Sequence, residues 1–388
     1  MYIHRAIEPD VLESLENNPV TAILGPRQCG KSTLAKYIIE NFSKEAIYID
    51  LERPSDLRKL DDAEWFLETQ KEKLVCLDEI QRKPELFPTI RSLVDSWGVN
   101  GHFLVIGSAS RELIKQSSES LAGRISYKRL NPFHWDEIST IAKLENYLTR
   151  GGFPRSLLAK SDQLSFQWRE DFITTFLERD LLLWSGFSPD TMRRLWQMLA
   201  NLNGQIINYS NLGSALGVSH TTVRNYVDLL SATFMVMLLP PYLANTNKRL
   251  VKTPKIYLGD QGLANALLGI KNFVQLTGHP TMGALWESAV LINLTSAFPQ
   301  LRFCFYRTSK GEEVDFVIET DNDLIAIECK ASVAPQISKG TYKAIDDLNP
   351  ALTIVVTPVE KGWQMNEKII IANISEAIRL ISIKTGNN

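Results

Sequence analysis

The sequence predicts an α/β protein that begins with a parallel β-sheet covered by helices on both faces. Residues 19–130 alternate short β-rich runs with amphipathic segments; for example, the run TAIL at 21–24 precedes an amphipathic segment at 31–41. Parallel strands need crossovers between them, so this alternation is typical of such a sheet. From about 132 to 185 the strand signals vanish, which predicts a helical lid on the sheet domain.

Length and composition indicate a globular protein of two or three domains. The chain has 388 residues, of which 44% are hydrophobic and 22% charged, a balance that excludes a disordered or fibrous chain. The 42 basic and 44 acidic side chains leave a net charge of −2, so contact with nucleic acid must come from local patches. Four cysteines without a C-x-x-C pair, and no signal peptide or membrane-spanning run, predict a cytoplasmic protein with no membrane partner.

The segment 25–32 has the spacing of a phosphate-binding loop. It reads GPRQCGKS, follows an apolar run and opens a predicted helix. Glycines let backbone N–H groups surround phosphates, Lys31 neutralises the β and γ oxygens, and the Ser32 hydroxyl ligates Mg²⁺. A chance glycine-rich turn is the alternative. The residues predicted to bind the nucleotide are Gly25, Pro26, Arg27, Gln28, Cys29, Gly30, Lys31, Ser32 and Thr33.

Two later strands end in the polar groups that nucleotide hydrolysis needs. The apolar run at 74–77 ends in Asp78 and Glu79; Asp78 can hold Mg²⁺ through water, and Glu79 can activate the attacking water. The strand at 103–106 is followed by Ser108, which either senses the γ-phosphate or caps a helix. An acidic helix start after a core strand would explain the two carboxylates, but not their pairing with the phosphate loop.

The order of these segments resembles an AAA+ ATPase, in which one strand intervenes between the phosphate-loop strand and the acidic strand. The motifs GPRQCGKST, LDEIQ, IGSAS and SLAGRISYKRLNPF resemble the bacterial and archaeal ATP-binding family with a C-terminal DUF4143 domain, and the similarity extends through GGFPRSLL and KTPKIYLGDQGL. The resemblance implies ATP and Mg²⁺ as cofactors and a homo-oligomer, for which a hexameric ring is one arrangement.

The same resemblance implies an arginine finger that acts on the nucleotide of a neighbouring subunit. Arg124 occupies the expected place just before the fifth core strand, and a guanidinium suits the charge that develops on the γ-phosphate. The alternative is a surface arginine in a basic turn. Arg155, in the lid, is a weaker candidate for a second sensor.

Residues 209–231 have the pattern of a helix-turn-helix, with Gly217 at the turn. A β-like run at 234–239 and a basic stretch at 245–255 follow, which predicts a winged helix with a basic wing. Winged helices bind either DNA or proteins, and the basic stretch favours DNA. The side chains predicted to contact DNA are His220, Thr221, Thr222, Arg224, Lys248, Arg249, Lys252 and Lys255.

The C-terminal part carries acids whose placement resembles the PD-(D/E)XK nuclease superfamily. Strands are predicted at 313–319 and 324–329, and a hairpin between them places Asp315 opposite position 328 or 330. Carboxylates that hold Mg²⁺ and a lysine that orients water would suit a phosphodiesterase, whereas a silent domain with a buried ion pair is the alternative. The predicted site consists of Glu287, Asp315, Glu328 and Lys330.

These segments predict three domains: an AAA+ core with its lid at 1–185, a winged helix at 186–258 and a PD-(D/E)XK-like α/β domain at 259–388. The predicted function is a Mg²⁺-dependent ATPase that remodels or translocates on DNA, including branched or junction DNA. An ATP-gated DNA nuclease is one alternative. A nucleotide-controlled protein switch or scaffold with a silent nuclease-like domain is the other.

Overall fold

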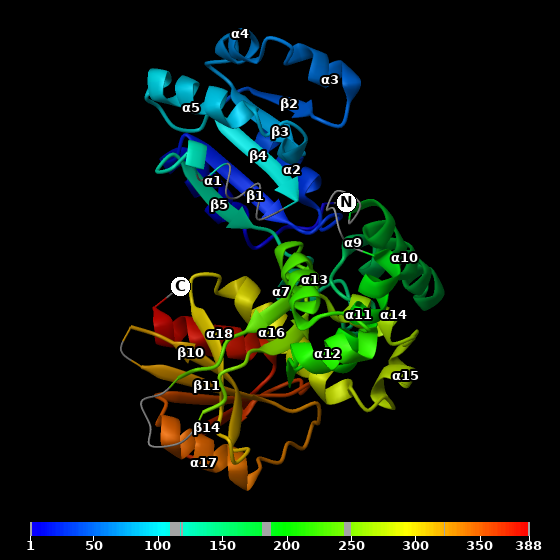
Figure 1. The fold of residues 1–388 in the computed structure, drawn as a ribbon. Helices are drawn as coiled ribbons and strands as arrows, with labels where there is room; N and C mark the ends of the chain where they lie inside the picture. The colour runs from blue at the N-terminus through cyan, green and yellow to red at the C-terminus, as the bar shows by residue number, and fades with distance from the viewer. Residues whose placement is uncertain are drawn as a thin grey trace. The chain divides into compact units, whose positions relative to one another are not determined.

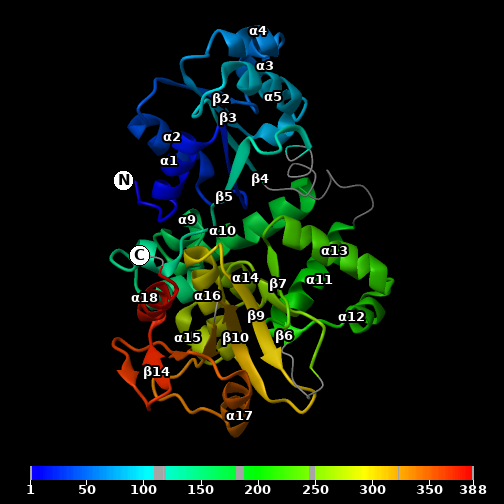
Figure 2. The same ribbon diagram turned by 90° about the vertical axis from the view of Figure 1, so that its left-hand side faces the viewer.

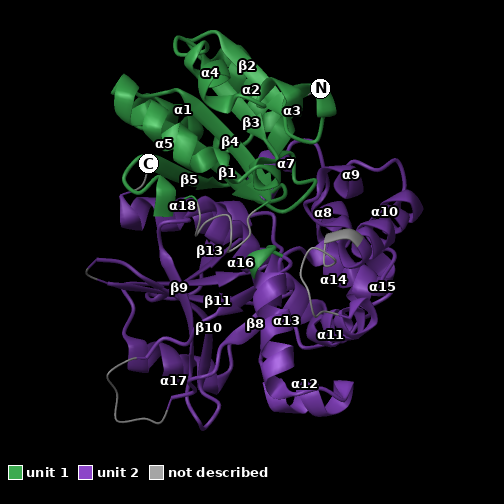
Figure 3. Cartoon of the chain, turned by 45° about the horizontal axis from the view of Figure 1, so that its top comes forward, with its two compact units in different colours: residues 1–133, 232–234 green, residues 134–231, 235–388 purple. Residues whose placement is uncertain are grey.

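The computed structural model describes residues 2–108, 117, 119–180, 188–243, 250–321 and 323–386. The chain divides into two compact units, residues 1–133 with 232–234 and residues 134–231 with 235–388 (Figures 1 and 3). The sequence assigned 134–185 to the first domain, but its helices belong to the second unit. Arg169 within this range, for example, donates to the carbonyl oxygen of Gly262 at 2.8 Å. A division of the second unit at 258 stays a prediction.

The first unit is a five-stranded parallel sheet with the order β2-β3-β4-β1-β5. Because β4 lies between β1 and β3, the strand arrangement is the one predicted. All strands run the same way, so their carboxyl ends share one edge of the sheet. The strands are β1 (Val20–Gly25), β2 (Ala46–Asp50), β3 (Leu74–Asp78), β4 (Phe103–Ser108) and β5 (Ile125–Arg129). The helices are α1 (Glu8–Asn17), α2 (Lys31–Asn41), α3 (Pro54–Lys59), α4 (Ala63–Glu68) and α5 (Leu86–Trp97).

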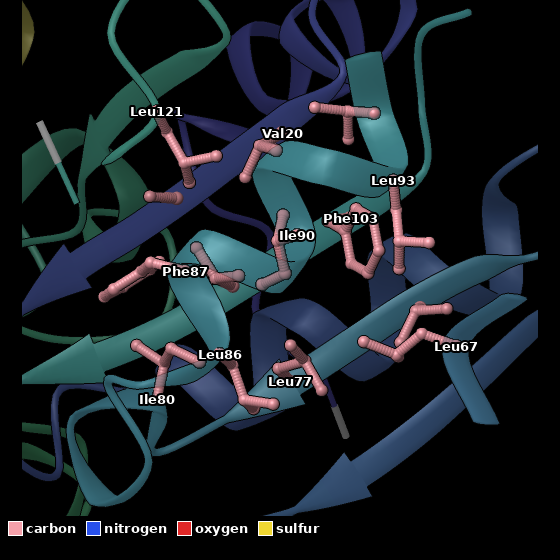
Figure 4. Packing of buried hydrophobic residues seen from close by; sticks show 14 of the residues in the cluster. Val20, Leu67, Leu77, Ile80, Leu86, Phe87, Ile90, Leu93, Phe103 and Leu121 are labelled. Atoms are coloured by element: carbon pink, nitrogen blue, oxygen red, sulfur yellow. The ribbon is translucent and has the colours of Figure 1, made fainter. Parts of the chain in front are cut away.

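Helix α5 covers the core on one face of this sheet (Figure 4). Its buried positions include Phe87, Ile90 and Leu93, which recur at the three- and four-residue spacing of one helix face. They pack against strand residues such as Val20 and Phe103. Each fully buried side chain of this size contributes about 1.5–3 kcal/mol, so this core fixes the strands whose ends form the predicted site.

The second unit begins with helices that lead to a small antiparallel sheet of order β6-β8-β7. Gly217 has φ +70°, which only glycine adopts at low cost, and it turns the chain between the two helices predicted at 209–231. The helices are α7 (Trp135–Ile138), α8 (Leu144–Arg150), α9 (Pro154–Leu157), α10 (Asp162–Thr175), a π-helix (Phe176–Asp180), α11 (Pro189–Asn201), α12 (Tyr209–Leu216), α13 (His220–Ala232), α14 (Gln261–Leu267) and α15 (Phe273–Thr277). The strands are β6 (Gln205–Ile206), β7 (Val236–Leu239) and β8 (Lys255–Leu258).

The unit ends with a mixed six-stranded sheet of order β13-β14-β12-β11-β10-β9. Strands β9, β10 and β14 of this sheet are labelled in Figure 2. Strands β10 and β11 form the predicted antiparallel hairpin, and Phe316 pairs with Ile327. Extended by one residue, this register places Asp315 opposite Glu328. The strands are β9 (Arg302–Arg307), β10 (Glu313–Glu319), β11 (Leu324–Cys329), β12 (Leu352–Val356), β13 (Trp363–Gln364) and β14 (Ile369–Ala372), and the helices are α16 (Met282–Ala297), α17 (Lys339–Leu348) and α18 (Ile374–Thr385). Within the described ranges, every helix is too short or too polar to cross a bilayer.

Candidate functional site

The predicted phosphate loop connects β1 to α2 through a tight backbone turn. A Cβ atom on Gly25 would overlap the carbonyl oxygen of Leu130, so only glycine fits where β1 ends. Gln28 and Gly30 both have positive φ angles, 60° and 104°. No side chain caps the first turn of α2 at Gly30, so the N-terminal amides of this eleven-residue helix can face an anion. The loop therefore fits a phosphate group.

Lys31 lies in the first turn of α2, and its side chain folds back over the loop. Its Nζ donates to the carbonyl oxygens of Gly25 at 3.1 Å and Pro26 at 2.8 Å, and the residue is only 5% exposed. Both partners are neutral. A phosphate in the loop would offer the ammonium group a charged acceptor, which makes a stronger hydrogen bond than a carbonyl does.

The two predicted Mg²⁺ ligands are connected by a tyrosine that the sequence analysis missed. Asp78, at the end of β3, accepts from its neighbour's backbone N–H through Oδ1 at 2.9 Å and from the Tyr48 hydroxyl through Oδ2. Ser32 also lies close enough to Tyr48 to influence its phenol, whose pKa is raised by burial together with Asp78. A hydroxyl and a carboxylate are oxygen donors of the kind Mg²⁺ prefers. This donor set therefore fits the predicted metal.

Glu79 follows Asp78 with a left-handed backbone, φ 58° and ψ 45°. Such a conformation costs of the order of 1–3 kcal/mol for a residue with a side chain, and it occurs most often at functional sites. Its carboxylate accepts a hydrogen bond from the Gln81 amide. Burial raises the pKa of Glu79, and the positive charge of Lys31 partly offsets this rise. Lys31 is thus close enough to influence the predicted base.

Ser108 ends β4 beside the phosphate loop, because it pairs in register with Gly25. Its place is the one predicted for a γ-phosphate sensor. The residues that follow it in the motif IGSAS, at 109–110, lie outside the described residues.

Arg124 lies at the opposite edge of the sheet from the phosphate loop. It precedes β5, and its carbonyl oxygen accepts from the backbone N–H of Val20 at 3.1 Å, at the start of β1. Its guanidinium pairs with Asp95 of α5, with Nη2 and Oδ2 3.0 Å apart. This pairing raises the pKa of Arg124 and lowers that of Asp95. Arg124 therefore does not meet the loop of its own chain. The other sensor candidate, Arg155, is exposed on α9.

Arg5 supports the phosphate loop from the N-terminal segment, a role that no motif in the sequence indicated. It is 6% exposed, and it donates to the carbonyl oxygens of Cys29 at 3.2 Å and Asn131 at 2.7 Å. Its guanidinium also lies 4.6 Å from the centre of the Phe133 ring. Arg5 therefore ties the loop to the segment that follows β5.

Helix α13 presents polar side chains to solvent, as the sequence predicted. His220, Thr221 and Arg224 are exposed, and Thr222 is half-buried because it hydrogen-bonds to Ser219 at the start of the helix. Lys252 is also exposed, whereas Lys248 and Arg249 lie outside the described residues.

Lys255 corrects the prediction of an exposed basic wing. It is 2% exposed, and in β8 its ammonium group points into a cluster of acids. Its Nζ lies 2.7 Å from a Glu313 oxygen, 3.1 Å from a Glu287 oxygen and 3.8 Å from an Asp315 oxygen. The strand alternates, so a lysine that ends a basic run in sequence can still face inward. We refer to Lys255, Glu287, Glu313 and Asp315 as the carboxylate cluster.

The remaining predicted nuclease residues flank this cluster. Glu328 pairs with Lys330 at 2.6 Å and accepts from the Thr341 hydroxyl at 3.3 Å. Asp315 accepts from the backbone N–H of Cys329 at 2.8 Å. The structure thus brings all four predicted residues together, and it adds Lys255, Glu313 and a hydroxyl of Tyr257 that donates to Glu287.

Burial, together with the negative charge of Asp315, raises the pKa of Glu287 to about 7 and that of Glu328 to about 8. The ion pair with Lys255 opposes this rise in Glu287, but burial outweighs it because one lysine serves several acids. Across the described ranges, no three acidic, histidine or cysteine side chains are arranged, as they stand, to hold a metal ion. With the Lys255 ammonium group between its acids, the cluster does not fit the Mg²⁺ site predicted for it.

Family models match three consecutive parts of the chain. An AAA domain covers residues 17–139, DUF8612, a domain of unknown function, covers 141–273, and DUF4143, another such domain, covers 282–377. The fold and the nucleotide site thus define a P-loop ATPase of the AAA+ class, and the predicted fold class is confirmed.

Two mycobacterial proteins resemble the whole chain. Uncharacterized protein Rv2008c of Mycobacterium tuberculosis and uncharacterized protein Mb2031c of Mycobacterium bovis are each 37% identical over 358 residues, which is 92% of this chain and 80% of theirs. The chain belongs with them to the predicted family, AAA-domain proteins with a C-terminal DUF4143 domain.

Solved structures that resemble the chain include two from Thermotoga maritima. The RuvB Holliday junction branch migration motor is 16% identical, with a TM-score of 0.30, over 60% of this chain and 87% of that one. Domain III of the replication initiation protein DnaA is 15% identical, with a TM-score of 0.28, over 48% of this chain and 94% of that one.

Proposed function

We propose that this protein is a Mg²⁺-dependent ATPase that couples ATP hydrolysis to the binding and remodelling of DNA, with branched and junction DNA among its substrates. The observation that carries the ATPase part is the shared sheet edge at which the phosphate loop, Asp78 and Glu79 lie together. Hydrolysis needs a phosphate cradle, a metal ligand and a base for water within one site, and this edge supplies all three.

Each predicted residue of the first unit has its own role in ATP hydrolysis. Lys31 leaves the carbonyl oxygens of Gly25 and Pro26 and contacts the β and γ oxygens of ATP. Ser32, and Asp78 through water, would hold Mg²⁺, which would neutralise charge on the phosphates. Glu79 orients water and accepts its proton, and the neighbouring Ser108 contacts the γ-phosphate.

Arg124 completes this site in a second copy of the chain. It lies at the far edge of its own sheet, so it can stabilise the transition state only for a neighbour. We therefore propose a homo-oligomer, with a hexameric ring as one arrangement, in which Arg124 exchanges its Asp95 partner for the γ-phosphate of the adjacent subunit.

The DNA part of the proposal rests on α13, which we take as the recognition helix of a winged helix, and on Lys252, which precedes β8. Helix α13 follows the turn at Gly217 and exposes His220, Thr221 and Arg224, side chains that donate to phosphates or base edges. Lys252 adds a positive charge beside β8. These contacts are few, so DNA affinity should fall with salt in proportion to the small number of phosphates reached.

A panel of duplex, fork and four-way junction DNA, scored together for binding, ATPase stimulation and strand separation, tests the proposal. Wild-type protein should bind DNA and hydrolyse ATP faster in its presence. The double variant Thr221→Ala/Arg224→Ala should lose binding and stimulation but keep the DNA-free ATPase rate. Its matched control is Arg193→Ala, a change on α11 outside the proposed DNA surface. If no DNA binds and none changes ATP turnover, the DNA proposal fails, and a nucleotide-controlled protein switch or scaffold becomes the better-supported function.

A further inference from the structure

The carboxylate cluster is neutralised by the chain's own lysine. Lys255 comes from β8, Glu287 from α16, and Glu313 and Asp315 from one face of β10. An ammonium group has three N–H donors. Here Glu313 and Glu287 lie within hydrogen-bond distance of Nζ, and Asp315, at 3.8 Å, adds an ion pair. Its Nζ also lies 5.5 Å from the centre of the Phe305 ring, which closes another side of the group. Lys255 is therefore held on several sides by groups of its own chain.

The neighbouring acid, Glu328, is also paired with a lysine of this chain. Glu328 pairs with Lys330 at 2.6 Å and is 4% exposed. Arg307 pairs with the second oxygen of Glu313 at 2.9 Å. The positive charges that balance these acids thus all come from this chain.

A divalent ion and Lys255 cannot share this site. Mg²⁺ binds oxygens at about 2.0–2.1 Å in an octahedral shell, which would need the same carboxylate oxygens that now accept from Nζ. Two cations so close in a buried site would also repel each other strongly. Oxygen donors are present, but the space between them is taken by the ammonium group.

We propose that Lys255 occupies a latent divalent-cation site and keeps the nuclease-like domain free of metal. The lysine replaces the ion as the charge that holds β8, α16 and β10 together, and removing it exposes a site for Mg²⁺ or Mn²⁺ made by Glu287, Glu313 and Asp315. This inference is independent of the proposed DNA-dependent ATPase, because it concerns metal binding without nucleotide or DNA.

Mn²⁺ titration of nucleotide-free protein, followed by electron paramagnetic resonance of the free ion, tests the inference. Lys255→Ala should bind one more Mn²⁺ per chain than the wild type, and the added Asp315→Asn change should abolish that gain. Mn²⁺ should also raise the melting temperature of Lys255→Ala by several degrees. The matched control, Lys252→Ala, changes an exposed lysine three residues away and should behave as the wild type.

The single change Asp315→Asn keeps the test decisive even if Lys255→Ala does not fold. It should leave Mn²⁺ binding of otherwise wild-type protein unaltered, since Lys255 still occupies that site. The proposal is overturned if wild-type protein holds a Mn²⁺ ion that Asp315→Asn removes, or if folded Lys255→Ala gains none. Loss of ATPase in these variants would bear on the proposed function and not on this inference, which is read from the bound metal alone.

Discussion

Lys31 and Lys255 are both buried lysines in regions where the sequence predicted a catalytic site, yet their partners differ in kind. Lys31 donates to two neutral backbone carbonyls. Lys255 is surrounded by three carboxylates. A hydrogen bond between a charged group and a neutral carbonyl contributes about 1.5–3 kcal/mol, whereas removing one partner of a buried ion pair costs about 3–5 kcal/mol.

The difference separates a site that can accept a ligand from one that is already filled. Lys31 can exchange weak partners for a phosphate at little cost. Lys255 would have to leave several buried charges uncompensated. A catalytic residue type in a motif is therefore not enough to predict a binding site. The groups that its side chain already contacts decide whether a ligand can replace them.

The largest effect should come from Arg124→Ala. If Arg124 completes the nucleotide site of a neighbouring copy, the variant should hydrolyse ATP about 10³-fold more slowly. Steady-state phosphate release measures this rate, at protein concentrations where light scattering shows that the subunits assemble. Asp95→Asn frees the arginine and should keep most activity. Neither change should move the melting temperature, because the pair is exposed. If assembled Arg124→Ala hydrolyses ATP at the wild-type rate, Arg124 does not act on the nucleotide of the neighbouring subunit.

Glu79→Gln should lower ATP turnover on the order of 10²-fold, since the amide cannot accept a proton from water. Nucleotide binding, measured with a fluorescent ATP analogue, should persist because the loop and Lys31 are unchanged. Gln81→Ala removes only the partner of Glu79 and should have a smaller effect on turnover. Full activity in Glu79→Gln would show that another group activates water.

Tyr48→Phe should reduce turnover about tenfold, because a hydrogen bond to a charged group contributes about 1.5–3 kcal/mol. The change removes the hydroxyl that holds Asp78 and contacts Ser32. The apparent affinity for Mg²⁺, read from ATPase at varied metal, should weaken while ATP affinity changes less. Tyr37→Phe, on α2, is the matched control. An unchanged Mg²⁺ dependence in Tyr48→Phe would mean that Asp78 is positioned without it.

The smallest effects should be opposite pH dependences of stability in the two units. Burial lowers the pKa of His102 to about 4, below its ordinary 6.5, so the first unit loses stability as pH falls from 6.5 to 4. Burial raises the pKa of Glu328 from 4.5 to about 8, so the second unit loses stability as pH rises through that range.

Calorimetric unfolding between pH 4 and pH 8 can separate these contributions. His102→Phe should lessen the acid loss, and Glu328→Gln should lessen the loss at higher pH, each by a few degrees in melting temperature. A pH profile that neither variant alters would show that other groups dominate the titration.

The nucleotide site could largely be predicted because its parts are local in sequence. Residues 25–33 are contiguous, and parallel strands bring Asp78 and Ser108 to the same edge once their order is known. Tyr48 and Arg5 could not be predicted, because Tyr48 reaches Asp78 only through strand pairing. Arg5 reaches Cys29 across 24 residues without a motif. The helix pair at 209–231 was predictable from Gly217 and the apolar spacing.

The sequence by itself determined the α/β class, the phosphate loop, the two acids after β3 and the hairpin that places Asp315 opposite position 328 or 330, because periodicity and motif spacing are local properties. Only the tertiary structure decided that residues 134–180 pack with the second unit and that Lys255 faces acids. Its partners lie at least 32 residues away. Burial and ion pairing between such distant segments depend on how sheets and helices meet, which local patterns do not encode.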